Sequence, residues 1–191
     1  NPMAGQGTDT EKLIDKIKEV SLFLNEDIGL HVTSAPGDAE RFAKEYCEIH
    51  GAARFIACGG DGTLGEVVSG ASECPDAQIG VIPLGTGNDF CRNFAQSDDF
   101  LSIAAQIEGE STKCDVIRYR TTLNGKEKTG YCVNMFNIGF DCNVADMTAS
   151  MKKKPFISGS LAYLLSIFVV LIKKKGAKLL SKRFNSMDNL L

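Results

Sequence analysis

The sequence predicts an α/β fold built around a mostly parallel sheet, and three observations lead to this prediction. Helical and strand-like apolar patterns alternate from residue 9 to residue 82, which is the order expected of α/β folds. The apolar runs at 54–58 and 79–82 each lead into a glycine-rich turn. A hydrophobic fraction of 43% over 191 residues can fill the core of one domain, or of one domain and part of another.

The elements before residue 108 are assigned in order from their patterns. Apolar residues recur at helical spacing over 9–25, where a Thr and a Glu form a capping box. Segment 30–34 is expected to be a short strand. Gly37 and Asp38 then begin a second helix, which Gly51 ends. The next elements are a strand at 54–58, a helix at 64–71, a strand at 79–82 and a helix at 99–107.

The pattern changes near residue 112. Strand-like segments at 113–119 and 131–138 flank Asn124-Gly125, a dipeptide typical of tight hairpins. A turn at 139–141 then leads to a possible helix at 142–150. We therefore expect an α/β domain at 1–111, extending to about residue 120, and a partial β-rich domain with one apolar helix at 112–191.

The segment 155–172 carries no charged residue and lies between two runs of three lysines. Its length approaches the lower limit for a membrane-spanning helix. A helix lying at a membrane surface would also suit it, because lysines favour an anionic interface. The third alternative is an ordinary buried helix, and the sequence leaves all three open.

The loop at 59–63, Gly-Gly-Asp-Gly-Thr, follows a predicted strand and precedes a predicted helix. Such loops bind phosphate, because glycines let the backbone approach the anion and the first N–H groups of the helix point at it. The carboxylate of Asp61 repels phosphate but suits a magnesium ion or a lysine. The alternative is that this short motif is only a turn.

Two further glycine-containing loops, at 1–7 and 83–89, support the binding interpretation. Loop 83–89 follows a predicted strand, and we expect loop 1–7 to follow one that would precede Asn1. Ligands of parallel sheets bind beyond the carboxyl ends of the strands. The three loops should therefore meet at one edge of the sheet.

Composition excludes some classes of function. The net charge of −3 gives no basic field, so no nucleic-acid partner is expected. The seven cysteines form no C-x-x-C pair and no zinc spacing with histidine. They are expected to be reduced, and several to be small buried apolar residues.

Together the three loops resemble the catalytic-domain signature of the diacylglycerol kinase-like lipid kinases, and most closely the soluble bacterial members. The resemblance covers roughly residues 1–175. It implies a three-layer, Rossmann-like (NAD kinase-like) nucleotide-binding domain, followed by the start of a truncated β-rich domain. NAD kinase shares the Gly-Gly-Asp-Gly-Thr loop but not the third motif. The matching motifs are Asn1-Pro2-Met3-Ala4-Gly5, Gly59-Gly60-Asp61-Gly62-Thr63 with Glu66, and Pro83-Leu84-Gly85-Thr86-Gly87-Asn88-Asp89-Phe90.

The resemblance implies ATP and Mg²⁺ as cofactors. From the residues themselves, Asp61, Asp89 and Asp115 could share a magnesium ion, and waters or lysines are the other partners that suit them. The alternatives are a helix cap for Asp89, a charge at a strand edge for Asp115 and an exposed helical position for Glu66. The implied ATP site comprises Asn1, Pro2, Met3, Ala4, Gly5, Thr33, Gly60, Asp61, Gly62, Thr63, Leu64, Gly65, Glu66 and Thr86.

The implied reaction transfers the γ-phosphoryl group of ATP to the hydroxyl of a diacylglycerol-like lipid at a membrane surface. The protein would then be cytoplasmic, bound peripherally to the membrane, and possibly a homodimer. In the family the acid that accepts the hydroxyl proton lies in the second domain, and we expect it beyond residue 191. The chain is therefore expected to be inactive or weakly active alone. An inactive nucleotide-binding remnant and an NAD kinase are the alternatives.

Overall fold

The computed structural model describes residues 1–4, 10–94, 100–123, 125–135, 139–152 and 159–173. The chain forms two compact units, Asn1–Met135 and Phe136–Leu191. The helices of the first unit are α1 (Thr10–Leu24), α2 (Asp38–His50), α3 (Asp61–Ala71) and α4 (Ile103–Glu108), with a short 3₁₀ turn at Cys91–Asn93. Its strands are β1 (Arg54–Gly59), β2 (Gln78–Pro83), β3 (Ile117–Leu123) and β4 (Lys126–Cys132).

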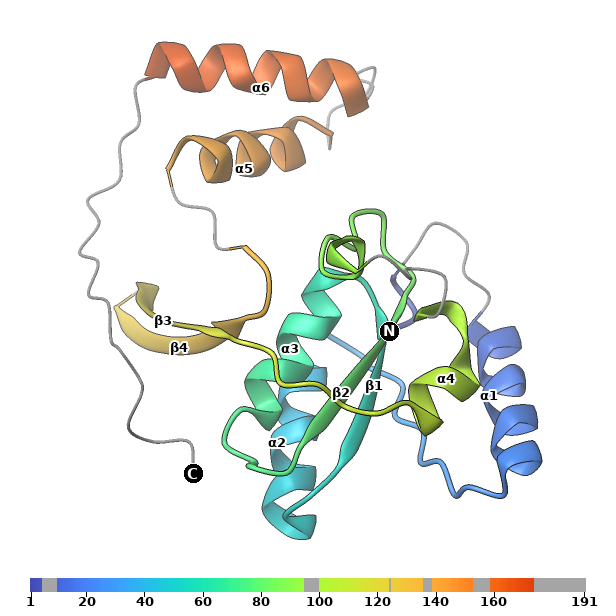
Figure 1. Cartoon of the computed structure of the whole chain (residues 1–191). Helices are drawn as coiled ribbons and strands as arrows, with labels where there is room; N and C mark the ends of the chain where they lie inside the picture. The colour runs from blue at the N-terminus through green and yellow to red at the C-terminus, as the bar shows by residue number, and fades with distance from the viewer. Residues whose placement is uncertain (5–9, 95–99, 124, 136–138, 153–158, 174–191) are drawn as a thin grey trace. The chain divides into compact units, whose positions relative to one another are not determined.

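A parallel pair of strands forms the centre of the first unit. β1 and β2 align from Arg54 opposite Gln78 to Gly59 opposite Pro83. Helices α2 and α3 lie on one side of this pair, and α1 and α4 lie on the other, as Figure 1 shows. The three-layer α/β arrangement with a parallel sheet is as the sequence predicts.

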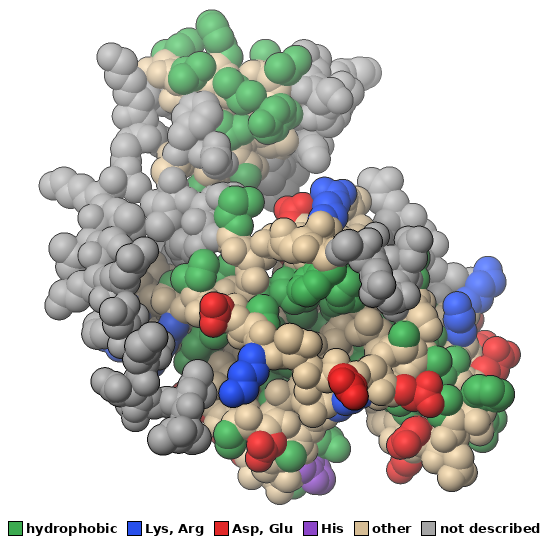
Figure 2. Space-filling view, in the orientation of Figure 1, with side chains coloured by type: hydrophobic (Ala, Val, Ile, Leu, Met, Phe, Trp, Pro, Cys, Tyr) green, Lys and Arg blue, Asp and Glu red, His purple; other side chains and the backbone are tan. Residues whose placement is uncertain are grey.

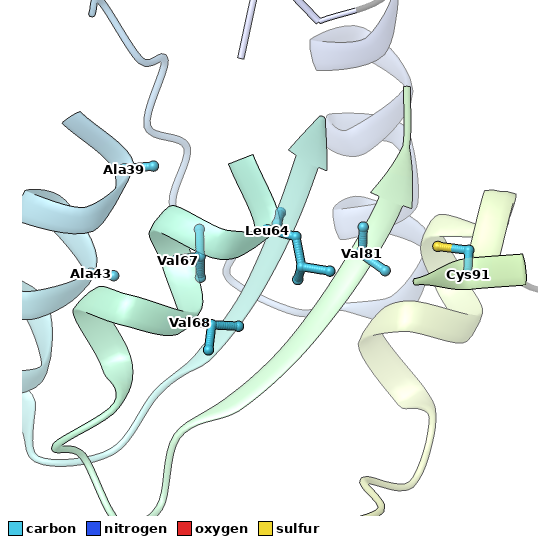
Figure 3. Packing of buried hydrophobic residues seen from close by; sticks show 8 residues of the cluster. Ala39, Ala43, Leu64, Val67, Val68, Val81 and Cys91 are labelled. Atoms are coloured by element: carbon cyan, nitrogen blue, oxygen red, sulfur yellow. The ribbon is translucent and has the colours of Figure 1, made fainter. Parts of the chain in front are cut away.

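Alternation along the two strands sends side chains to opposite faces. On one face Ala57 and Val81 pack against α2 and α3, and Figure 3 shows Leu64, Val67 and Val68 of α3 pointing into this cluster. On the other face Ile82 packs with Ile17 of α1 and Ile103 of α4. α1 turns its acidic and basic side chains outward, as Figure 2 shows. Burial on both faces explains why the two strands are continuous apolar runs.

The segment predicted to be a strand at 30–34 forms no strand. Its sequence has the required pattern, but a strand exists only where its backbone pairs with a neighbour, and β1 pairs only with β2 in the described sheet. Leu30 and Val32 are consequently left 45% and 49% exposed. This prediction is therefore wrong for the structure as described.

The predicted antiparallel hairpin forms, but its strands begin and end at residues other than those the sequence indicates. β3 and β4 run directly into the turn, pairing Leu123 with Lys126 and Ile117 with Cys132. These two strands are exposed and carry many charged residues, so their hydrophobic pattern is weak. The pattern therefore predicts strand ends that lie too far from the turn. The hairpin contacts α3, where the Tyr131 N–H donates to Ser69 Oγ at 3.2 Å.

The second unit contains α5 (Phe140–Lys152) and α6 (Gly159–Lys173), which contact each other, and Val144 of α5 and Val170 of α6 are buried. α5 includes the helix expected at 142–150, and α6 covers most of the uncharged segment 155–172. None of the helices described is both long and apolar enough to cross a membrane. Leu164 and Phe168 of α6 are each 64% exposed, and Figure 2 shows hydrophobic side chains gathered over this helix.

Two glycines of α3 provide a matched test of the α2–α3 packing. A methyl group on Gly70 would lie 2.2 Å from the Glu40 carbonyl oxygen and 2.9 Å from the Ala43 Cβ, whereas one on Gly65 would meet nothing within 4 Å. Overpacking typically costs about 1–3 kcal/mol, so Gly70→Ala should lower the free energy of unfolding by about that amount. Gly65→Ala should leave it unchanged or raise it by up to about 1 kcal/mol, through helix propensity. Urea denaturation measures both, and equal effects would contradict this packing.

Candidate active site

A cleft of about 620 Å³ opens where β1 and β2 end. Four segments surround it: the N-terminal turn, the segment before α2, the first turn of α3 and the loop after β2. The three glycine-containing loops thus meet at the carboxyl edge of the sheet. The residues that line the cleft are Asn1, Met3, Ala4, Thr33, Ser34, Ala35, Pro36, Ala39, Gly60, Asp61, Gly62, Thr63, Glu66, Gly85, Thr86 and Gly87.

The first turn of α3 faces the cleft without a side-chain cap. Gly60 precedes the helix in an extended conformation, and Leu64 is the first residue whose N–H bonds back, to the Gly60 carbonyl at 3.1 Å. The N–H groups at the start of a helix have no partner within it and carry the positive end of its dipole. The lining residues Asp61, Gly62 and Thr63 therefore present backbone donors to the cleft.

Backbone contact between two glycines brings the α3 loop and the β2 loop together. A Cβ on Gly85 would lie 2.6 Å from the Gly60 Cα, and one on Gly60 would lie 3.1 Å from the Gly85 Cα. No larger residue fits at Gly85 without displacing the backbone. Glycine at this position therefore sets how closely the two loops approach each other.

Asn88 closes the β2 loop on itself. Its side-chain oxygen accepts from the Gly85 N–H at 3.0 Å, and its amide nitrogen donates to the Gly85 carbonyl at 2.7 Å. Asn88 has a φ of 53°, and asparagine tolerates this left-handed conformation better than most residues. The asparagine of the predicted motif thus shapes the loop rather than lining the cleft.

Asn1 holds the N-terminal turn against the start of α3. Its side-chain amide donates to Thr63 Oγ1 at 3.0 Å, and its terminal amino group donates to the Cys58 carbonyl at 2.9 Å. Its side-chain oxygen accepts from the Met3 N–H at 2.9 Å, which folds the turn. Partial burial lowers the pKa of the amino group. Asn1 therefore links the end of β1, the N-terminal turn and α3.

Asp38 and Glu66 hold the segment before α2. The Ser34 N–H and hydroxyl donate to Asp38 Oδ2 at 2.8 and 3.0 Å, and Arg41 donates to its other oxygen. The hydrogen bond from the Ser34 N–H, reinforced by the one from Arg41, holds the pKa of Asp38 well below its usual 3.8. From α3, Glu66 Oε1 accepts from the Gly37 N–H at 2.8 Å.

Of the three carboxylates predicted to bind metal, Asp61 and Asp89 lie nearest to the loop after β2. A Cβ on Gly87 would lie 2.9 Å from an Asp61 oxygen and 3.9 Å from an Asp89 oxygen. Asp61 also accepts from the Phe90 N–H at 3.3 Å, and Asp89 pairs with Arg92 at 3.2 Å. Within the described parts of the chain, no three His, Cys, Asp or Glu side chains are placed to hold one metal ion together.

Comparison with known proteins identifies the family. A family model described as the diacylglycerol kinase catalytic domain matches residues 1–119. This chain belongs to that family. The resemblance seen in the three glycine loops is thereby confirmed.

Diacylglycerol kinases of Staphylococcus aureus strains JH9 and Newman are each 34% identical to this diacylglycerol kinase-family chain over 188 residues. These alignments cover 94% of the chain and 54% of each relative, so the chain spans about half the length of the curated relatives it matches. The crystal structure of a diacylglycerol kinase from Bacillus anthracis str. Sterne aligns with 27% identity and a TM-score of 0.52. This alignment covers 80% of the present chain and 51% of the Bacillus anthracis chain.

The structure gathers most, but not all, of the residues that the family resemblance singled out. Leu64 is only 3% exposed and packs in the core, and Asp115 is exposed and does not line the cleft. Gly5 lies outside the described residues. The predicted residues that line the cleft are Asn1, Met3, Ala4, Thr33, Gly60, Asp61, Gly62, Thr63, Glu66 and Thr86, whereas Pro2, Leu64, Gly65, Asp89 and Asp115 do not.

Sequence reasoning missed several residues of the cleft. Gly85 and Gly87 of the third motif line the cleft but are not among the predicted site residues. The same is true of the segment Ser34-Ala35-Pro36 and of Ala39. The signal was present, because an apolar run, a turn and a helix start occur there in the same order as at 54–64.

The ionised form of Asp38 should stabilise this diacylglycerol kinase-family fold at neutral pH. Because its folded pKa is depressed, the contribution is present above the usual value of 3.8 and is lost as the pH falls below it. Asp38→Asn should therefore lower the urea midpoint at pH 7 and flatten its fall between pH 5 and pH 3. Asp15→Asn, at an exposed position of α1, is the control. An unchanged acid profile in Asp38→Asn would contradict the assignment.

Proposed function

We propose that this chain binds ATP with Mg²⁺ in the cleft and forms the nucleotide-binding part of a lipid kinase. The lipid kinase would transfer the γ-phosphoryl group to the hydroxyl of a diacylglycerol-like lipid. The observation that carries the proposal is the uncapped start of α3, which opens into a glycine-lined cleft. The names of the relatives support the lipid as acceptor, since they are called diacylglycerol kinases.

The chemistry of the cleft suits a polyphosphate. Backbone N–H groups at Asp61, Gly62 and Thr63 would bind phosphate oxygens, and the helix dipole favours their negative charge. Gly60 and Gly85 leave backbone without side chains where the two loops meet. Thr33 and Thr86 add hydroxyl groups at two other walls of the cleft. We infer that the triphosphate lies along α3's first turn.

Asp61 and Asp89 would hold the magnesium ion, and Asp115 remains a proposed third ligand. Carboxylate oxygens are the ligands magnesium prefers, and the ion usually keeps several waters, so two protein carboxylates suffice. When bound, the ion neutralises charge that develops on the transferred phosphoryl group. The residues of the chain then orient the nucleotide, which is the main requirement of phosphoryl transfer.

The lipid would be reached at a membrane surface, with the protein cytoplasmic and peripherally bound. The exposed apolar side chains of α6, including Leu164 and Phe168, supply a surface of the required chemistry. No described residue is assigned as the acceptor of the lipid hydroxyl proton. Formation of a homodimer is part of the same proposal, and it rests on the family resemblance alone.

A nucleotide-binding chain without transferase activity is the second candidate. It is favoured by the roles of the two carboxylates that line the described cleft. Asp61 is proposed to hold magnesium and Glu66 accepts from the Gly37 N–H, so neither is assigned to accept the hydroxyl proton. Such a chain would bind ATP and Mg²⁺ but release no phosphorylated acceptor. NAD kinase activity is the remaining alternative.

The magnesium assignment is tested by replacing Asp61. Asp61→Asn should weaken ATP binding in Mg²⁺ by about tenfold or more, the scale seen for partners of metal sites. EDTA removes the Mg²⁺, and the Asp61 carboxylate then only repels the phosphates of ATP. In EDTA the Asp61→Asn substitution should therefore weaken ATP binding much less. Asp76→Asn, which removes an exposed acid between α3 and β2, is the control for net charge. Isothermal titration calorimetry gives both affinities, and equal losses in Mg²⁺ and EDTA would contradict a metal role.

The acceptor is tested with γ-labelled ATP and three conditions: dioleoylglycerol in phosphatidylglycerol vesicles, NAD in solution, and no acceptor. Labelled phosphatidic acid from the wild-type chain, reduced in Asp61→Asn, is the result expected of the lipid kinase. ATP binding without any labelled product would support the second candidate instead. Labelled NADP would overturn the lipid assignment.

A further inference from the structure

Two cysteines lie near the same end of the first unit, on segments that are far apart in the sequence. Cys47 belongs to the last turn of α2, and Gly51 follows that helix. Cys74 lies in the turn between α3, which ends at Ala71, and β2. Figure 1 shows that α2 and α3 both end at the edge of the sheet where β1 begins, away from the cleft. The packing of these two helices therefore brings Cys47 and Cys74 to one place.

Hydrogen bonds join the two helices near both of their ends. Near the cleft, Glu66 of α3 accepts from the Gly37 N–H, just before α2, at 2.8 Å. At the other end, the Cys74 thiol donates to the Gly51 carbonyl at 3.0 Å. The two helices therefore run in the same direction, and the side chain of Cys74 lies against the end of α2.

Backbone hydrogen bonds hold both cysteines in position. The Gly51 N–H donates to the Cys47 carbonyl at 2.8 Å, and Gly51 ends the helix with a left-handed φ of 74°. The Cys74 N–H donates to the Ala71 carbonyl at 3.0 Å, and the Cys74 carbonyl accepts from the Ala77 N–H at 3.2 Å. The positions of the two sulfur atoms are therefore set by the end of one helix and by a hydrogen-bonded turn.

The side chains of Cys47 and Cys74 also meet each other. Partial burial, and then a hydrogen bond with the Cys74 side chain, raises the pKa of the Cys47 thiol to about 11. Cys47 is therefore held as a thiol at neutral pH, beside a second free cysteine. Elsewhere in the described parts of the chain, the sulfur atoms of Cys58, Cys114 and Cys132 lie against backbone carbonyls.

Two other roles for the pair fit the structure less well. A metal ion bound by thiolates usually takes four ligands, and among the residues that the structure describes no group of three His, Cys, Asp or Glu side chains is placed to hold one ion. A purely apolar role suits Cys91, which is 4% exposed, but Cys47 and Cys74 are both partly open to solvent. A small oxidant can therefore reach them, and two adjacent accessible thiols are the arrangement that forms a disulfide.

We propose that Cys47 and Cys74 are a redox modification site, at which a peroxide forms a reversible disulfide between the end of α2 and the turn after α3. One sulfur, as thiolate, attacks hydrogen peroxide and becomes a sulfenic acid, and the first water leaves. The other sulfur then attacks the sulfenic sulfur, which forms the S–S bond and releases the second water. The two thiols lose two electrons and two protons, and the peroxide gains them. Neither cysteine lines the cleft, so the proposal is independent of nucleotide and lipid.

The test treats the full chain with equimolar hydrogen peroxide, alkylates the remaining thiols, and maps the products by mass spectrometry after digestion with trypsin and Glu-C. A peptide holding Cys47 should be joined to one holding Cys74. The bond closes a loop that contains β1 and the first turn of α3, so Tm should rise by about 5–10 °C. Dithiothreitol should reverse both changes. A disulfide between other cysteines, a covalent dimer as the main product, or an unchanged Tm in the cross-linked chain would overturn the proposal.

Serine variants separate this pair from the other thiols. Cys47→Ser and Cys74→Ser should each abolish the rise in Tm on oxidation, because either change removes one sulfur of the bond. Cys114→Ser, at an exposed position, is the matched control and should keep the full rise. A rise that survives in Cys47→Ser or Cys74→Ser, or that disappears in Cys114→Ser, would assign the effect to another thiol. The peptide map of the wild-type chain decides the same question without any substitution, so a variant that fails to fold does not protect the proposal.

Discussion

The contact between the backbones of Gly60 and Gly85 is the constraint on which the site depends. Parallel pairing of β1 and β2 brings the two loops to one edge, but it does not determine how closely they approach. The absence of a Cβ on either residue lets the loops touch. The start of α3 then presents backbone N–H groups on one side of the cleft. The loop after β2, which Asn88 holds through its hydrogen bonds to Gly85, forms the other side.

Hydrogen bonds made by residues that line the cleft fix its walls in place. Asn1 bonds to Thr63, Glu66 bonds to the backbone of Gly37, and Asp38 bonds to Ser34. Two of these three interactions end on α3, so this helix both presents its first backbone N–H groups to the cleft and supports the neighbouring segments. Donors held in this way would need little reorganisation if an anion bound there, which is the property that electrostatic stabilisation requires.

Among the described residues, the outer edge of β1 has no neighbouring strand. α4 covers the outer edge of β2 through Gln106, whereas the outer edge of β1 meets a groove with apolar walls. The turn that begins at Asn1 lies at the boundary between that groove and the cleft, because Asn1 lines both. Asn1 is therefore common to the groove along β1 and to the cleft at the ends of the strands.

The sequence by itself determined the α/β class, the helices α1 to α3, the two parallel strands and the loops that meet at their ends, because apolar period and glycine-rich turns are local signals. It did not determine that segment 30–34 lacks a strand, since pairing depends on a neighbour far away in the chain. Nor could it place Asp61 beside Asp89 while leaving Asp115 outside the cleft, or bury Leu64 in the core. Those outcomes depend on how α3 and the β2 loop pack, and only the tertiary structure sets the distances between residues that are remote in sequence.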